Sequence, residues 1–126
     1  MQIKYQNIIL RDMRESDIED WFRWKTTETE WSEWDAPWEE LDPSLDPEEY
    51  RKEELERIQT RKTDHRFRLE IDTADGVHIG AVNAYCIDES FNWEAYFEEA
   101  DRQKLNWAMG IDICDRDYWS GGWGTQ

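Results

Sequence analysis

Strict alternation around a tight turn is the feature that most constrains the fold of this chain. In "HRFRLEIDT" the apolar residues Phe67, Leu69 and Ile71 fall on one side of an extended strand and charged residues fall on the other. An Asp-Gly turn follows, and the next run, "VHIGAVNAYCI", is apolar or small on both sides. This pattern predicts a β-hairpin of strands 65–73 and 77–87. The second strand is expected to be central in its sheet and covered on both faces.

Two different periods occupy the region before the hairpin. The run "QNIILRDM", 6–13, is rich in β-branched residues and predicts a strand that ends near Met13. The run "RESDIEDWFRWKT", 14–26, places its apolar residues at helical spacing. Ser16 and Glu19 have the spacing of a capping box, so this helix is predicted to begin near Ser16.

A second helix and a last strand complete the predicted elements. Asp46, Pro47 and Glu49 make a strong helix start, and the helical run continues to residue 62. The alternating run "LNWAMGIDIC" predicts a strand at 105–114, with small residues on one face. The order is strand, helix, helix and three strands, which indicates one α/β (α+β) domain, 1–126, with a mostly antiparallel sheet.

Two segments have no clean period. Residues 27–45 contain tryptophans at 31, 34 and 38, and we expect a loop with helical turns, including a short helix ahead of Pro37. Residues 88–104 are polar and acidic with interspersed aromatic side chains, and a loop or a short helix is expected there.

The charge balance restricts the partners of the protein. Its 126 residues include 31 acidic and 15 basic side chains, a net charge of -16. Nucleic acid is excluded as a partner, because phosphate binding needs clustered Lys and Arg. Nine tryptophans distinguish the chain from acidic disordered segments, which are poor in aromatic residues. The acidity fits either a basic, polyamine-like partner or an acidic surface that is simply solvated.

Cysteine, histidine and apolar runs add further exclusions. Cys86 and Cys114 lie in strand-like runs without a CxxC pair, and His65 and His78 stand alone, so no structural zinc site is expected. Two thiols without a signal peptide indicate a reduced, cytoplasmic protein. No apolar run approaches the ~18 residues of a membrane span.

The chain ends on a glycine-rich turn, "DYWSGGWGTQ", that follows the last predicted strand. A strand that leads into such a turn and a helix start can bind phosphate through main-chain N–H groups. The spacing matches neither the GxGxxG turn of dinucleotide-binding folds nor the P-loop. Taken alone, the turn is a weak signal and is better explained as a tight surface turn.

The surrounding residues resemble a known family. "MGIDICDRDYWSGGWGTQ" is similar to the GNAT acetyltransferases, in particular to the branch of ribosomal-protein N-terminal and spermidine acetyltransferases. That branch shows a strand followed by Gly-Asp-x-x-Tyr-Trp-Gly-x-Gly-Tyr-Gly-Thr-Glu-Ala. Trp119 replaces the Gln or Arg of the broad acyl-CoA signature, as is usual in this branch, and Gln126 stands where Glu is common. "IILRDMRESDIEDWFRW" and the hairpin with Ile79-Gly80 also resemble the first half of these proteins.

The resemblance implies acetyl-CoA as cofactor. Ile113 and Cys114 would offer backbone groups to the pantetheine arm, and the glycine-rich turn would hold the pyrophosphate. The residues implied in cofactor binding by this turn are Trp119, Ser120, Gly121, Gly122, Trp123, Gly124 and Thr125. Cys114 is expected to be a strand residue beside the cofactor and not a nucleophile, because no basic side chain is near it in the sequence.

The resemblance also implies transfer of an acetyl group to a primary amine, with a carboxylate as base. Glu30, Glu33 and Glu89 are candidates for this base, and nothing in the sequence selects among them. Residues 15–56 contain 17 acids and four bases, together with Trp31 and Trp34, so we expect them to line a site for a cationic amine. Packing of these indoles under a loop is an equally good interpretation.

The resemblance covers only the first half of the family fold, so we expect a partial domain that stops at the start of its third helix. An open sheet edge favours association of the chain into a homo-oligomer. Two further hypotheses stand beside the enzyme: a non-catalytic, self-associating GNAT-like fragment, and an acidic protein-interaction module.

Overall fold

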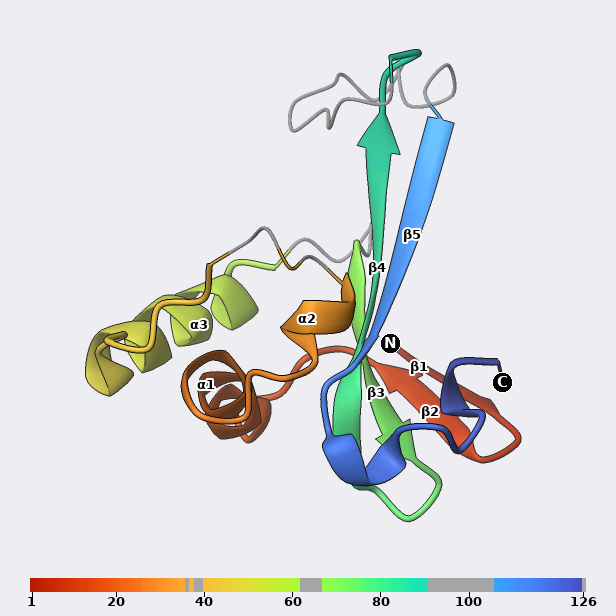
Figure 1. Ribbon diagram of the computed structural model, residues 1–126, viewed down its shortest axis with the longest axis horizontal. Helices are drawn as coiled ribbons and strands as arrows, with labels where there is room; N and C mark the ends of the chain where they lie inside the picture. Colours follow the sequence, from red (N-terminus) through yellow and green to blue (C-terminus); the bar gives the residue numbers. More distant parts are fainter. Residues whose placement is uncertain (36, 38–39, 62–66, 91–105, 126) are drawn as a thin grey trace.

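The fold is built on one five-stranded sheet with helices against one face. The computed structural model describes residues 1–35, 37, 40–61, 67–90 and 106–125. All neighbouring strands are antiparallel, in the order β1-β2-β3-β4-β5. The strands are β1 Gln2–Tyr5, β2 Ile8–Arg11, β3 Arg68–Thr73, β4 His78–Ile87 and β5 Asn106–Ile113. Figure 1 shows β4 and β5 extending well beyond the other strands. The predicted α+β class with a mostly antiparallel sheet is confirmed.

The first predicted strand, 6–13, is confirmed as β2, but the sequence did not predict β1, which precedes it and forms a hairpin with it. β1 pairs with β2 in a register that places Ile3 opposite Leu10. The chain reverses at Gln6, which adopts a left-handed φ of 49°. This turn has no glycine or proline to mark it, and only Asn7, a residue common in turns, signals the reversal.

The central hairpin and the last strand are confirmed. Gly76 has a φ of 84° in the tight turn between β3 and β4, which is why glycine is suited to this position. A β-bulge between Ile71 and Asp72 shifts the register, so that Asp72 lies opposite His78. β4 lies between β3 and β5, as predicted for a central strand, but its burial is continuous only over its first four residues. Near its end Cys86 is buried and Tyr85 is exposed.

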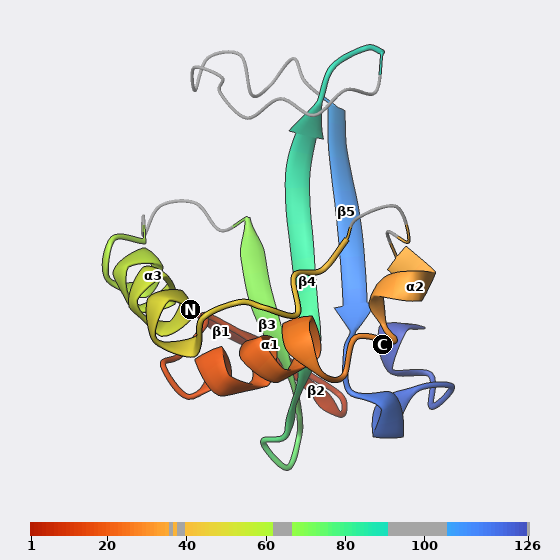
Figure 2. The ribbon, with the colours of Figure 1, turned by 60° about the vertical axis from the view of Figure 1, so that its left-hand side comes forward.

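Three helices pack on the same side of the sheet or at its edge (Figures 1 and 2). They are α1 Asp17–Thr26, α2 Ser32–Asp35 and α3 Pro47–Gln59. The short helix expected ahead of Pro37 is therefore confirmed as α2. α3 begins as predicted, with the Asp46 carboxylate accepting a hydrogen bond from the Glu49 amide at 2.8 Å. None of the helices in the described ranges is long and apolar enough to cross a membrane.

The capping box predicted at Ser16 is wrong. Ser16 precedes α1, but its side chain makes no capping hydrogen bond. The carboxylate of Asp17 instead accepts a hydrogen bond from the Arg14 amide at 2.7 Å. Asp17 is turned inward because Arg11 binds both of its carboxylate oxygens, so a tertiary contact replaces the local cap.

The hydrophobic core lies between the helices and the sheet. Its buried members are Ile18, Trp21, Trp24, Tyr50, Ala81 and Cys114. Trp24 is completely buried, and its ring meets that of Trp21 edge-on at 5.1 Å. Burial of one such aromatic side chain contributes about 4–6 kcal/mol of gross transfer free energy. These indoles therefore fix α1 against the sheet.

A network of buried charges lies beneath α1. Arg11 on β2 donates hydrogen bonds to Asp17 at 2.6 and 2.8 Å and to Asp72 on β3 at 2.6 Å. Glu70, also on β3, accepts from the Trp21 indole at 2.8 Å and from Arg68 at 2.8 Å. Deleting one partner of such a buried pair costs about 3–5 kcal/mol, because an uncompensated charge remains.

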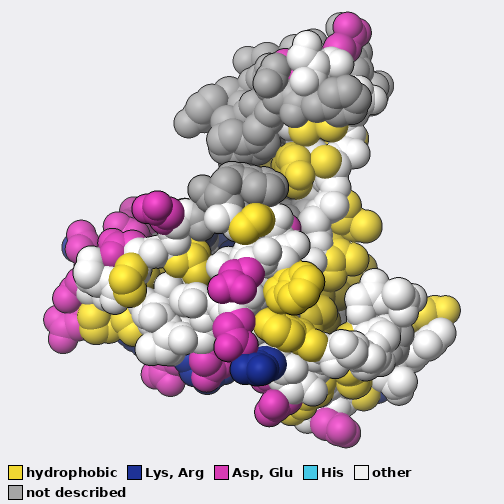
Figure 3. All heavy atoms as spheres, viewed as in Figure 1, with side chains coloured by type: hydrophobic (Ala, Val, Ile, Leu, Met, Phe, Trp, Pro, Cys, Tyr) yellow, Lys and Arg dark blue, Asp and Glu magenta, His cyan; other side chains and the backbone are white. Residues whose placement is uncertain are grey.

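The opposite face of the sheet is apolar from edge to edge. The register brings Leu69, Val82 and Ile111 into one row across β3, β4 and β5. Phe67 stacks on Trp107 at 6.1 Å, and Met109 beside them is 69% exposed. Figure 3 shows hydrophobic side chains at the surface along β4 and β5. Within the described ranges, no helix covers this row.

Candidate functional site

The site is organised around β5, which approaches β4 very closely at one point. A Cβ atom on Gly80 would lie 1.8 Å from the main-chain oxygen of Asp112. Only glycine permits this approach without displacing the backbone of β5. Gly80 therefore sets the path of β5 into the glycine-rich loop, and the Ile-Gly pair in β4 has a steric reason.

The glycine-rich loop follows β5 and folds back on it. The Asp115 carboxylate accepts from the Asp117 amide and starts a 3₁₀ turn, Arg116–Tyr118. Ser120 and Gly122 then adopt left-handed φ values of 60° and 75°. A second 3₁₀ turn, Trp123–Thr125, follows where the sequence predicted the start of a helix. The loop thus changes direction at two left-handed residues, Ser120 and Gly122, which flank Gly121.

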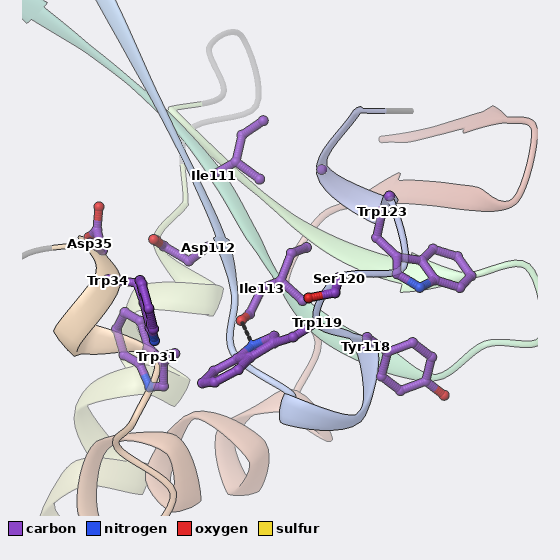
Figure 4. A pocket seen from close by; sticks show the side chains of 12 residues that line it. Trp31, Trp34, Asp35, Ile111, Asp112, Ile113, Tyr118, Trp119, Ser120 and Trp123 are labelled. Carbon is purple, nitrogen blue, oxygen red and sulfur yellow. Dashed lines mark hydrogen bonds between the residues drawn. The ribbon is translucent and has the colours of Figure 1, made fainter.

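An open pocket of about 430 Å³ surrounds the outer edge of β5. Figure 4 shows Asp112 pointing toward α2, whereas Ile111 and Ile113 point to the other side of the strand. Tyr118 and Trp119 lie below the strand in the same view. The lining residues are Trp31, Trp34, Asp35, Ile111, Asp112, Ile113, Tyr118, Trp119, Ser120, Gly122, Trp123 and Gly124.

Most of the residues singled out in the sequence meet in this pocket. Both indoles expected at the amine site line it, as do six of the residues implied in cofactor binding: Ile113, Trp119, Ser120, Gly122, Trp123 and Gly124. Gly121 and Thr125 belong to the same loop but do not line the pocket. Cys114 is buried in the core and borders a smaller cavity beside α1.

The backbone groups expected to bind pantetheine already have partners within the chain. The Ile113 carbonyl accepts a hydrogen bond from the Trp119 indole at 2.7 Å (dashed in Figure 4). The Cys114 amide donates to the Ile79 carbonyl at 2.8 Å. A ligand that paired with the carbonyl would share this oxygen with the indole of Trp119 or displace the indole. The role of these two residues therefore stays a prediction.

The two indoles at the amine side are held differently. Trp31 donates its indole N–H to the Trp24 carbonyl at 2.9 Å and packs edge-on against Trp21 at 6.1 Å. Trp34 on α2 is 82% exposed. Trp31 is therefore a fixed wall of the pocket, whereas the face of Trp34 is open to a ligand.

Asp112 is the carboxylate that sequence reasoning missed. Burial, the nearby charge of Asp35 and a hydrogen bond to Asp35 raise its pKa to about 6, against the opposing charge of Arg68. The two carboxyl groups lie at the same end of the pocket (Figure 4). The only signal in the sequence was a charged residue within the apolar strand "GIDIC". A carboxyl group with this pKa is mostly ionised at neutral pH and can still take a proton.

The carboxylates proposed as bases from sequence lie elsewhere. Glu30 forms an ion pair with Arg116 at 2.9 Å. Glu33 and Glu89 are exposed, and neither of them lines the pocket.

A second cluster, Asp17, Asp20 and His78, has three oxygen and nitrogen atoms within 4.8 Å of one another. Such spacing suits a metal ion, but Asp17 already accepts two hydrogen bonds from Arg11. Both ring nitrogens of His78 also face carboxylates. These contacts favour a charge network over a metal site.

Comparison with known proteins identifies one family. The profile of the acetyltransferase (GNAT) domain matches residues 7–126. Neither the curated proteins nor the solved structures contain a significant match to the chain.

Proposed function

The chain belongs to the GNAT acetyltransferase domain family, and from that premise we propose that it is an acetyl-CoA-dependent N-acetyltransferase. The observation that carries the proposal is the pocket around β5, which joins the glycine-rich loop, two indoles and Asp112. The acceptor is a cationic primary amine, such as a protein N-terminus or a polyamine. We place the protein in the branch that acts on ribosomal-protein N-termini and spermidine, on the resemblance of its last 18 residues.

The loop fits an acyl-CoA phosphate group in composition and shape. Trp119–Thr125 contains no acidic side chain, although the whole chain has a net charge of -16. Ser120 and Gly122 have left-handed φ values, a conformation that occurs in anion-binding main-chain turns. A Cβ on Gly124 would meet no atom within 4 Å, so the loop leaves this side open. Bound acetyl-CoA would supply the acetyl thioester that the amine attacks, and its thiol would be the leaving group when the C–S bond breaks, carrying the second proton of the amine.

The remaining steps belong to side chains of the pocket. The exposed face of Trp34 and the wall formed by Trp31 receive the ammonium group by cation–π contact. The ionised carboxylate of Asp112 takes one proton from the ammonium and leaves a neutral amine, which is the nucleophile. Asp112 then releases this proton to solvent. Asp35 keeps the pKa of Asp112 near neutrality and helps hold the substrate charge.

The loop is tested by binding of acetyl-CoA to two matched glycine variants. Gly122 in the loop and Gly76 in the β3–β4 turn have similar left-handed φ values, 75° and 84°. We expect G122A to weaken binding at least tenfold by calorimetry, whereas G76A costs similar stability and leaves binding unchanged. Equal binding by both variants, or no binding by the wild-type protein at millimolar acetyl-CoA, would contradict the proposal.

A second candidate function is a non-catalytic, self-associating GNAT-like protein. The apolar row on the far face of the sheet favours it, since Trp107 and Met109 are largely exposed there. Self-association without acetyl-CoA binding would support this candidate, and turnover of acetyl-CoA with an amine would exclude it.

A further inference from the structure

His78 lies at the start of β4 with acidic groups on both sides of its ring. Its Nδ1 is 3.0 Å from Oδ2 of Asp20 on α1, and its Nε2 is 3.0 Å from Oε2 of Glu70 on β3. Asp17, also on α1, has an oxygen 3.7 Å from Nδ1. Carboxylate oxygens only accept hydrogen bonds, so both ring nitrogens must carry protons to satisfy both contacts. With both carboxyl groups ionised, this geometry fits the imidazolium form.

The charges around the ring lead to the same conclusion. Four carboxylates face this region: Asp17 and Asp20 from α1, and Glu70 and Asp72 from β3. Three arginines pair with them: Arg11 with Asp17 and Asp72, Arg23 with Asp20 at 3.1 Å, and Arg68 with Glu70. The fourth positive charge is that of His78. When the imidazole is neutral, the cluster loses one positive charge beneath α1, and Arg23 cannot replace it fully because it also pairs with Glu28 at 3.1 Å.

The His78 imidazole stays protonated although its ring is buried. Burial opposes the charged form, but the hydrogen bond to Glu70, the charges of Asp17 and Glu70 and the hydrogen bond to Asp20 outweigh it, and the pKa of His78 is raised. The rings of Trp24 and Trp21 lie 4.9 and 6.3 Å from the imidazole and separate it from water.

We propose that His78 is a pH-sensitive latch that holds α1 to the sheet as an imidazolium and loosens it when the proton is lost. The latch joins three elements, because His78 belongs to β4, Glu70 to β3 and Asp20 to α1. Loss of the proton leaves one nitrogen opposite a carboxylate with no hydrogen between them. That contact changes from attractive to repulsive. Asp17 and Trp21 stay bound to the sheet, and the part of α1 that can loosen is the turn around the partly exposed Asp20.

The latch reaches the pocket through α1. Trp24 packs on the imidazole, and its carbonyl holds the indole N–H of Trp31, which lines the pocket. Release of α1 therefore loosens one wall of the pocket. This inference does not depend on the proposed acetyltransferase activity, and its test needs neither acetyl-CoA nor an amine.

The pH range of the latch follows from proton linkage. A raised pKa in the folded state means that the latch contributes its full stabilisation below the unfolded pKa of about 6.5. This contribution is lost as the pH rises through the folded pKa of His78. Each unit of pKa difference corresponds to about a tenfold change in the folding equilibrium.

The test follows the ring nitrogens by NMR in the full chain and compares two variants of α1. Asp20 is partly exposed, with 27% of its side chain accessible, so D20N removes one acceptor from the ring without emptying the core. Glu19 is its exposed neighbour, and E19Q removes the same charge from the same helix turn without facing the ring. Hydrogen exchange of the α1 amides and of the Trp31 indole N–H measures how far α1 loosens when His78 loses its proton.

For the wild-type protein we expect both nitrogens of His78 to be protonated at pH 7. Exchange of the α1 amides, corrected for its intrinsic pH dependence, should accelerate at least tenfold as His78 deprotonates. D20N should move the titration of His78 and the acceleration of α1 exchange to lower pH. E19Q should leave the pH of both transitions unchanged. The proposal is overturned by a His78 that titrates at or below pH 6.5, by equal shifts in the two variants, or by α1 protection that does not follow the titration.

Discussion

Asp112 allows a prediction at the scale of single residues. A base acts only when ionised, so the rate of amine acetylation should rise as the pH increases through about 6, the pKa of Asp112. D35N removes the neighbouring negative charge that raises this pKa, and the rise in kcat/KM should move to lower pH. A pH–rate profile together with a carboxyl ¹³C NMR titration measures both effects.

The matched control for D35N is D117N, which removes one exposed charge from the nearby 3₁₀ turn. D117N should leave the profile in place, and D112N should abolish the step near pH 6. A pKa of Asp112 that is the same in D35N and in the wild type would refute the pairing of the two carboxyl groups.

The same carboxyl group affects stability in a defined direction. Its folded pKa is raised, so the protonated form stabilises the fold, and this contribution is lost as the pH rises through about 6. The pKa shifts of Asp17 and Glu70 have the opposite sign. Hydrogen bonds from Arg11 and His78 outweigh burial and lower their pKa values, so their contribution is lost as the pH falls. The free energy of unfolding should therefore be highest in mildly acidic solution.

At the scale of elements, the two long helices begin in different ways, which yields a second prediction. Asp46 caps α3 through its carboxylate, whereas Ser16 at the start of α1 makes no side-chain cap. D46A should lower the free energy of unfolding by about 1 kcal/mol, the usual value of a cap. S16A should change it by only a few tenths of a kcal/mol. Urea denaturation of the two variants side by side measures the difference, and equal losses would contradict it.

The contact between β4 and β5 yields a third prediction. G80A puts a methyl group 1.8 Å from the Asp112 carbonyl oxygen, so β5 has to move. We expect a loss of about 1–3 kcal/mol or more, the usual cost of overpacking. In G110A the added methyl group on β5 meets no atom within 4 Å, so it serves as the control.

Thermal unfolding and the position of the Trp119 indole signal in NMR spectra measure the effect of G80A. A stable G80A protein with an unchanged indole signal would show that the close approach of β5 does not position the loop.

The sequence predicts the elements whose signals are local. The Asp-Gly turn, the helix start at Asp46 and the alternation in β5 each lie within a few residues of the structure that they specify. The turn at Gln6 was not predicted because no glycine or proline marks it. The cap at Ser16 failed because Asp17 is drawn to Arg11 on another element.

The candidate site was predictable only where a motif carried it. Trp119 to Gly124 form one contiguous motif, and Trp31 and Trp34 stood out as indoles in an acidic segment. Asp112 gains its properties from Asp35, which is distant in sequence. His78 gains its properties from Glu70 and Asp20, and Asp20 is 58 residues away in the sequence. Periodicity within a single segment contains no information about such pairs.

At the scale of the whole molecule, the exposed apolar row and the net charge of -16 act against each other. Copies of the chain repel at low ionic strength, and salt screens this repulsion, with a Debye length of about 10 Å at 0.1 M. Self-association should therefore increase between 20 and 300 mM NaCl, concentrations chosen to span that range. Sedimentation velocity at both concentrations measures it.

Two variants show which face is responsible. M109K places a charge in the apolar row and should suppress association at high salt. Y85K adds the same charge at an exposed aromatic residue of β4 on the opposite face, and association should persist. Monomers at both salt concentrations would remove the support for an oligomer.

The two faces of the sheet also differ in how they should tolerate mutation. Phe67, Trp107 and Met109 look like core residues in the sequence, yet each of them is more than 40% exposed. Polar replacements there should be accepted in a library selected for folding. Glu70, Asp72 and His78 look like surface residues, yet each is buried, and even isosteric replacements should be rejected. At these six positions, hydrophobicity would rank the residues in the reverse order of their mutational sensitivity.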